Sequence, residues 1–169
     1  QVSSEDVLAG PDQGEEALSW VRDAATVCVC AVQLGLSEKA LSITAGYTAE
    51  RHQFGVPIAT FQAVKQRAAD CYIDVESIRV SASQAAWLLS EGRPASQATR
   101  VAKFHAAMGG YRVAFAAQHL HGGMGYDVDY PIHRYYLWSK AMELSLGTAS
   151  VQLSQLGAAL AERPFRIAE

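Results

Sequence analysis

The chain has 169 residues, of which 50% are hydrophobic and 18% are charged, and its formal net charge is −3. This length allows one domain with a core, and the composition excludes a disordered protein and offers no basic surface for nucleic acid or an anionic membrane. Three cysteines without a CxxC pair indicate free thiols in a reducing compartment, so we expect a cytoplasmic protein. The longest apolar stretch, residues 24–36, is too short to cross a bilayer.

The first residues lack the basic and apolar parts of a signal peptide, and there is no initiator methionine, so we expect a piece of a longer protein. Five prolines divide the chain into long proline-free segments that are rich in alanine, and no segment alternates between apolar and polar residues. The sequence therefore predicts an all-α protein. We interpret residues 1–14 as the extended remnant of a preceding β-domain, residues 15–163 as a four-helix bundle, and residues 164–169 as a tail.

The first two helices differ in their patterns. The first is predicted from about Glu15 to near Arg51; because residues 24–36 are apolar on nearly all sides, we expect it to be buried on most sides, with Gly35 at a close helix contact. The second is predicted between an N-cap at Thr60 and a stop at Gly92. Its charged residues, Asp74 among them, are expected to face solvent. Its apolar stripe is Phe61, Val64, Ala68, Cys71, Val75, Ile78, Ala82, Ala85 and Leu89.

The third helix is predicted to start near Pro94 and to end at the glycine-rich residues 121–125. Its expected core stripe is Val101, Phe104, Met108, Tyr111 and Phe115. The fourth segment opens at Tyr130-Pro131 and continues its apolar pattern to Leu160, so we expect one last helix there.

Three clusters carry candidate chemistry. Arg51 and Phe54 share a loop with Gly and Pro, where they would suit a phosphate and a flat ring; the alternative is a plain interhelical loop. The glycines of residues 118–126 would let a ligand approach the backbone; the alternative is a helix C-cap and turn. His119 and His121 in that segment have poor spacing for a shared metal, and no metal site is expected. Thr148, after Glu143, would cap the last helix or meet a ligand.

Taken together, the order and spacing of these motifs resemble the C-terminal helical domain of the acyl-CoA dehydrogenase family. The resemblance covers essentially the whole chain. It rests on Tyr47-Thr-Ala-Glu-Arg51-His-Gln-Phe54-Gly55-Val-Pro-Ile58, Phe61-Gln62, His121-Gly-Gly-Met-Gly-Tyr126, Tyr130-Pro131 and Gly147-Thr148.

The resemblance implies a flavoenzyme that uses FAD to oxidise the Cα–Cβ bond of an acyl-CoA thioester, with a glutamate as the base and electron-transfer flavoprotein or a similar acceptor. It also implies that the pyrophosphate and adenosine of FAD are met by a neighbouring subunit, and that Thr148 lies near the flavin of its own active site. His119 stands where the family usually has a glutamine. The implied cofactor-binding residues are Arg51, Phe54, His119, Gly122, Gly123 and Thr148.

The sequence departs from the family at the catalytic base. The glutamate that usually precedes the Gly-Thr pair is replaced by Leu146, and the position that some members use on the first helix is Ala25. Neither side chain can accept a proton, so no catalytic residue is expected at either place. Glu143, three residues before Leu146, is the candidate substitute, on the same side if the region is helical.

Three interpretations remain open. The favoured one is the partner subunit of a bacterial α2β2 acyl-CoA dehydrogenase of the steroid side-chain type, which completes the FAD site of a homologous base-bearing subunit. The second is a self-sufficient homotetrameric acyl-CoA dehydrogenase with an unusual base, and the third is a non-enzymatic helical assembly module. The acyl-CoA substrate is expected to bind only in the complete complex.

Overall fold

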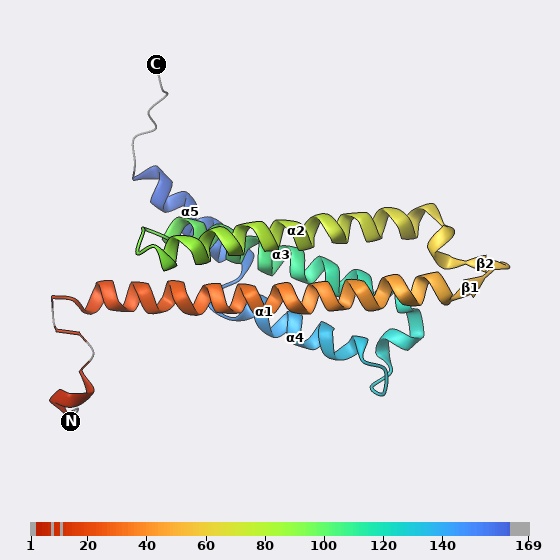
Figure 1. Cartoon of the computed structure of the whole chain (residues 1–169), viewed down its shortest axis with the longest axis horizontal. Helices are drawn as coiled ribbons and strands as arrows, with labels where there is room; N and C mark the ends of the chain where they lie inside the picture. Colours follow the sequence, from red (N-terminus) through yellow and green to blue (C-terminus); the bar gives the residue numbers. More distant parts are fainter. Residues whose placement is uncertain (1–2, 8, 11, 163–169) are drawn as a thin grey trace, which may run out of the picture.

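A computed structural model describes residues 3–7, 9–10 and 12–162 and shows an elongated helical bundle (Figure 1). Helices α1 (Gly14–Glu50), α2 (Gln62–Ser90) and α3 (Ser96–His121) run side by side, and α4 (Ile132–Leu144) packs along α1 and α3. Helix α5 (Ala149–Ala161) packs against α3 at the end of the bundle where α1 begins. The predicted all-α bundle is therefore confirmed.

Short elements connect these helices. Strands β1 (His52–Gln53) and β2 (Val56–Pro57) form an antiparallel hairpin in which His52 pairs with Pro57. Short 3-10 helices follow it at Ile58–Thr60 and follow α3 at Gly122–Tyr126. Near the N-terminus, Ser4–Asp6 forms a 3-10 helix rather than the expected extended segment. The assignment of residues 1–14 to a β-domain stays a prediction. Residues 163–169, which include the predicted tail of residues 164–169, lie outside the described residues.

Helix α1 does not bury its apolar residues as predicted. Trp20 is 61% exposed and Leu18 is 57% exposed, while the buried stripe is mostly small and polar. That stripe is Thr26, Cys30, Gln33, Ser37, Ala40, Thr44 and Thr48. One 18-residue window of α1 is long and apolar enough to cross a membrane by length and composition alone, but α1 packs against α2, α3 and α4 as a bundle helix.

Helix α3 is the central helix, and its buried face is not the predicted one. Phe115 is 49% exposed, and Met108 and Tyr111 are each 39% exposed. The face that packs against α1 and α2 carries small residues instead, because small side chains let helix backbones approach closely. Its buried small residues are Ala102, Ala106, Ala107, Gly109, Gly110, Ala114, Ala116 and Ala117.

Buried polar groups fill the narrow spaces that this packing leaves. Gln33 Nε2 donates to Ser37 Oγ at 3.0 Å and to Ser139 Oγ on α4 at 3.2 Å. A Cβ atom on Gly110 would clash with the same Gln33 side chain, so any larger residue there would have to displace Gln33. By contrast, nothing lies within 4 Å of a Cβ on Gly35, and the predicted close contact at Gly35 is wrong within this chain.

The predicted core stripe of α2 is confirmed for its central residues, which are buried from Cys71 to Ala85. Asp74 was expected in solvent but is buried, where it accepts a hydrogen bond from Arg112 Nε of α3 at 2.8 Å. Thr60 is not the N-cap; its hydroxyl donates to the Pro57 carbonyl, and Phe61 occupies the cap position. Gly92, with a φ of 63°, follows the end of α2 as predicted.

The predicted last helix is broken into α4 and α5. Helix α4 ends at Leu144, and the chain then turns through Leu146 and Gly147, whose φ angles are 56° and 98°. A left-handed backbone at leucine costs roughly 1–2 kcal/mol, so interactions from the surrounding structure must impose it. Apolar periodicity continued across this turn and gave no sign of the break.

Gly110 of α3 and Gly35 of α1 have different surroundings, so we predict opposite effects when each is replaced by alanine. Gly110→Ala should lower the free energy of unfolding by about 1–3 kcal/mol, because the methyl group displaces Gln33 from its two hydroxyl partners. Gly35→Ala should raise it by about 0.4–1 kcal/mol, because alanine favours the helix and meets no neighbour in the chain. Urea unfolding of both variants measures the difference, and equal effects would contradict the packing described for α1 and α3.

Candidate functional site

The β1–β2 hairpin projects beyond the end of the bundle (Figure 1), and the predicted binding residues Arg51 and Phe54 lie directly before it and at its tip. Arg51 follows the last residue of α1 and is exposed; within the described residues its guanidinium has no ion pair or hydrogen bond. Phe54 at the hairpin tip is 94% exposed and has a φ of 52°, with its ring 6.2 Å from that of Phe61. This end of the bundle therefore exposes an aromatic ring and a guanidinium that has no partner among the described residues.

The glycine-rich segment lies at the same end of the bundle. Gly122 ends α3 with a φ of 58°, and a Cβ at Gly122 or Gly123 would meet nothing within 4 Å, so the backbone is open to a ligand. His119 is exposed, stacks on Phe115 at 6.3 Å and joins Gly122 in lining a hollow of about 310 Å³. The remaining lining residues of this hollow are Phe115, Gln118, Tyr126 and Tyr136.

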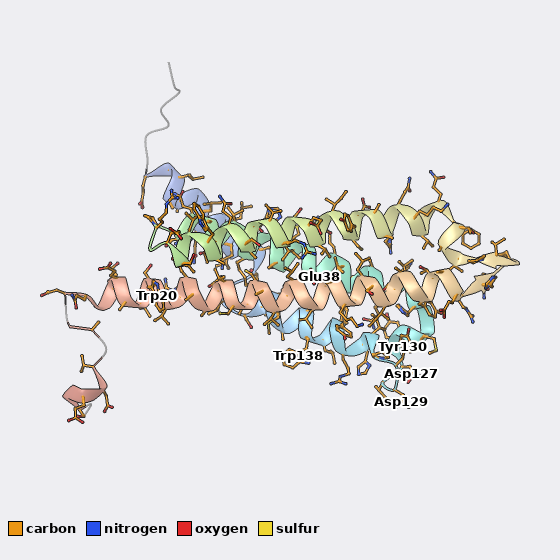
Figure 2. All side chains as sticks on the ribbon, viewed as in Figure 1. Trp20, Glu38, Asp127, Asp129, Tyr130 and Trp138 are labelled. Atoms are coloured by element: carbon orange, nitrogen blue, oxygen red, sulfur yellow. The ribbon has the colours of Figure 1, made fainter. Side chains whose placement is uncertain are left out.

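Buried His121 connects the two motifs, a role that the sequence alone did not show. Its ring stacks on Tyr47 of α1 at 4.3 Å and lies 5.2 Å from the ring of Tyr130. Figure 2 shows Tyr130 with Asp127 and Asp129 near the C-terminal end of α1, far from Trp20. His121 Nδ1 donates to the Ala117 carbonyl at 2.7 Å, and the buried Nε2 has no partner among the described residues. Tyr47, which lies one helical turn before Arg51 in the same motif, is the sequence signal that could have suggested this stack.

The third cluster lies elsewhere. Thr148 stands at the N-cap position of α5 without a capping hydrogen bond, and its hydroxyl lies 3.0 Å from Ser150 Oγ. Leu146 and Gly147 line a hollow of about 330 Å³ together with Asp23 and Thr26 from the first part of α1. Thr26 and Arg51 are separated by 25 positions of α1, which corresponds to roughly 37 Å along the helix at 1.5 Å per residue. The predicted site residues therefore form two groups at two separate places.

The structure also locates the candidate bases. Glu143 lies on the last turn of α4, and its carboxylate accepts a hydrogen bond from Lys140 Nζ at 2.7 Å. Because α4 ends at Leu144, Glu143 does not share a helical face with Leu146, and that expectation is wrong. Ala25 is exposed on α1. The carboxylate in the hollow beside Leu146 belongs to Asp23, which accepts a hydrogen bond from Ser96 Oγ at 2.6 Å.

The residues at the hairpin end fit a dinucleotide such as FAD. Arg51 supplies a planar fork for a pyrophosphate, Phe54 supplies a flat apolar surface, and the open glycine backbone allows close approach. Within the described part of the chain, no three His, Cys, Asp or Glu residues are grouped to hold a metal ion.

Burial lowers the pKa of His121 below its ordinary value of 6.5, partly offset by the hydrogen bond to Ala117, so the ring is neutral in the fold. The unfolded chain then binds the proton more readily, and the free energy of unfolding should fall as the pH drops from about 6.5 towards the lowered pKa. His121→Phe keeps an aromatic ring against Tyr47 and should show a smaller loss over this range. Thermal unfolding against pH measures the effect, with His52→Phe at an exposed histidine as the control. An equal acid loss in wild type and His121→Phe would contradict it.

Comparison with known proteins gives matches over nearly the whole chain. Residues 12–161 match the family model described as acyl-CoA dehydrogenase, C-terminal domain. Acyl-CoA dehydrogenase FadE27 of Mycobacterium tuberculosis is 43% identical over 159 residues, which cover 89% of this chain and 43% of the relative. The cofactor of this family is FAD.

Two solved structures are similar in both fold and sequence. The ChsE4–ChsE5 complex from Mycobacterium tuberculosis matches with a TM-score of 0.90 and 43% identity, over 97% of this chain and 44% of that one. The Tcur3481–Tcur3483 steroid ACAD G363A variant matches with a TM-score of 0.84 and 50% identity, over 86% and 40%. The chain thus spans less than half the length of these relatives. With this fold, these motifs and these matches, the chain belongs to the acyl-CoA dehydrogenase family, a family of oxidoreductases, and corresponds to its C-terminal domain.

Proposed function

We propose that this chain is the C-terminal bundle of a subunit that completes the FAD site of a base-bearing partner in a heterotetrameric acyl-CoA dehydrogenase. When bound, FAD supplies the hydride acceptor for α,β-dehydrogenation of an acyl-CoA thioester. In this chain, Arg51 would hold the pyrophosphate, Phe54 would pack against the adenosine end, and Gly122 and Gly123 would let the cofactor approach the backbone.

The observation that carries the proposal is Leu146. It stands where the family resemblance places the base, at a turn with a left-handed backbone and beside a hollow. An aliphatic side chain cannot take the α-proton of a thioester. At the hairpin end, by contrast, the groups suited to FAD are exposed and unpaired among the described residues. A chain that binds the cofactor but has no base needs a partner subunit that supplies the base.

The similar proteins support the choice of partner and substrate. One is named as a complex of two different subunits, and another is named as a steroid acyl-CoA dehydrogenase. We therefore propose a homologous base-bearing subunit in an α2β2 assembly, with steroid side-chain CoA thioesters as the substrate class. The electron acceptor would be electron-transfer flavoprotein or a similar carrier, and the protein would act in the cytoplasm.

One observation favours a second candidate, a self-sufficient homotetrameric enzyme. Asp23 brings a carboxylate into the same hollow as Leu146 and Gly147. The hydrogen bond from Ser96 holds this carboxylate towards the start of α3. We favour the partner-subunit function because Asp23 occupies neither of the two positions that the family uses for its base.

The test is production of the whole protein that contains this chain, alone and together with a base-bearing partner. Alone, it should purify with little flavin and no acyl-CoA dehydrogenase activity; with the partner, a yellow and active complex should form. Flavin absorbance and dye reduction with a steroid side-chain CoA measure the two states. A yellow, active protein made from this gene alone would overturn the proposal, and loss of that activity in Asp23→Asn would establish the second candidate.

Within the complex, Arg51→Ala should weaken FAD retention by about 10- to 100-fold, since charge-assisted hydrogen bonds contribute about 1.5–3 kcal/mol. The thermal stability of the protein without flavin should change little, because Arg51 is exposed. The matched control is Arg93→Ala. Arg93 lies in the α2–α3 loop at the other end of the bundle, with its guanidinium over the ring of Trp87. Equal flavin content in wild type and Arg51→Ala would remove Arg51 from the site.

A further inference from the structure

The last carbonyl groups of α4 accept hydrogen bonds from a side chain of another helix rather than from backbone N–H groups. In a continuing helix, the carbonyls of Met142 and Glu143 would accept the N–H groups of Leu146 and Gly147. Here Lys103 Nζ, from α3, donates to both carbonyls at 3.0 Å. The two backbone acceptors are therefore satisfied without helical structure beyond Leu144.

Lys103 is fully buried, and within the described residues no carboxylate lies within ion-pair distance of it. Burial lowers the pKa of its ammonium group. The two carbonyls at the negative end of the α4 dipole are the groups that compensate this buried charge. Two hydrogen bonds and the nearby negative charge of Glu143 therefore hold this buried ammonium group to the end of α4.

Gln152 fixes the same turn from the other side. Its side chain is almost fully buried at the start of α5, and Nε2 donates to the Leu146 carbonyl at 2.8 Å. A Cβ atom on Gly147 would lie 2.9 Å from this nitrogen, so the turn passes close to Gln152. The left-handed backbone of Leu146 and Gly147 is thus held between Lys103 before it and Gln152 after it.

We propose that Lys103 is a positioning residue: it ends α4 and sets the turn that carries Leu146, Gly147 and Thr148. The position of Leu146, the side chain at the family's base position, is then determined by Lys103 of α3. The functional meaning of this placement rests on the proposed function, but the contact itself does not.

Lys103→Met keeps the length and apolar body of the side chain and removes all three donors. In the whole protein, the amides of Ser145 and Gln152, which bond to the carbonyls of Ala141 and Thr148, should exchange at least about tenfold faster with solvent deuterium. The control is Ser139→Ala, which removes a buried hydroxyl of α4 that contacts Gln33 and should leave exchange at these two amides unchanged. Unchanged exchange in Lys103→Met would overturn the proposal.

The complex with the partner separates this role from general destabilisation. Lys103→Met should retain FAD to within about twofold, because Arg51 lies at the far end, whereas Arg51→Ala should lose FAD with normal exchange at Ser145 and Gln152. If both variants lose FAD, Lys103 acts on overall stability and the proposal fails. If the wild-type complex holds no flavin, the proposed function fails while the exchange measurement still decides the role of Lys103.

Should Lys103→Met not fold, lysine methylation of the wild type decides. Buried Lys103 should be labelled only as fast as the turn opens, so its labelling and the exchange of Ser145 should rise together in mild denaturant. Labelling of Lys103 while Ser145 stays protected would contradict the proposal.

Discussion

The close approach of α3 to its neighbours is the constraint on which the rest of the bundle depends. Glycines and alanines line the buried face of α3, so the spaces between helices are too narrow for large apolar side chains. Three polar groups in these spaces have a partner on another helix: Gln33 donates to Ser139, Asp74 accepts from Arg112, and Lys103 donates to two carbonyls of α4. Each pair fixes one helix relative to another, because a buried polar group without its partner is costly. Packing and polar pairing therefore specify the same arrangement.

The same constraint places large apolar side chains on the outside. Phe115 and Tyr111 of α3, Trp138 of α4 and Trp20 of α1 are each 39% exposed or more. Figure 2 labels Trp20 and Trp138 on α1 and α4. Large exposed apolar residues on several helices are typical of surfaces that contact other protein. The chain spans 40–44% of the length of its relatives, so the outer faces of the bundle are the surfaces available to further domains and subunits.

Sequence patterns predicted the fold where large residues mark the core and failed where small residues do. The stripe of α2 was correct from Cys71 to Ala85, but on α3 the large residues marked the outer face, since glycine and alanine carry little hydrophobic signal. Asp74 was misplaced because its partner Arg112 lies 38 positions away. The break after Leu144 was missed for a similar reason: its cause is Lys103, some 40 positions earlier. The site motifs could be recognised as candidates because Arg51 and Phe54 lie in one short loop and Gly122 in another, each with a glycine that is visible in the sequence. Their binding role stays a prediction, and the His121 stack could not be recognised because it needs tertiary contact with Tyr47.

The two groups of site residues can differ independently because the bundle separates them. Roughly 37 Å of α1 lies between the hollow beside Leu146 and the hairpin that carries Arg51, and substitutions so far apart have nearly additive effects. The Leu146 turn is held by Lys103 and Gln152, neither of which lies at the hairpin end. In the proposed function, Leu146 at the position that the family resemblance gives to the base therefore leaves the groups suited to FAD unchanged. The proposed division of one active site between two homologous subunits depends on this separation, because residues at one end of the bundle can change while those at the other end stay in place.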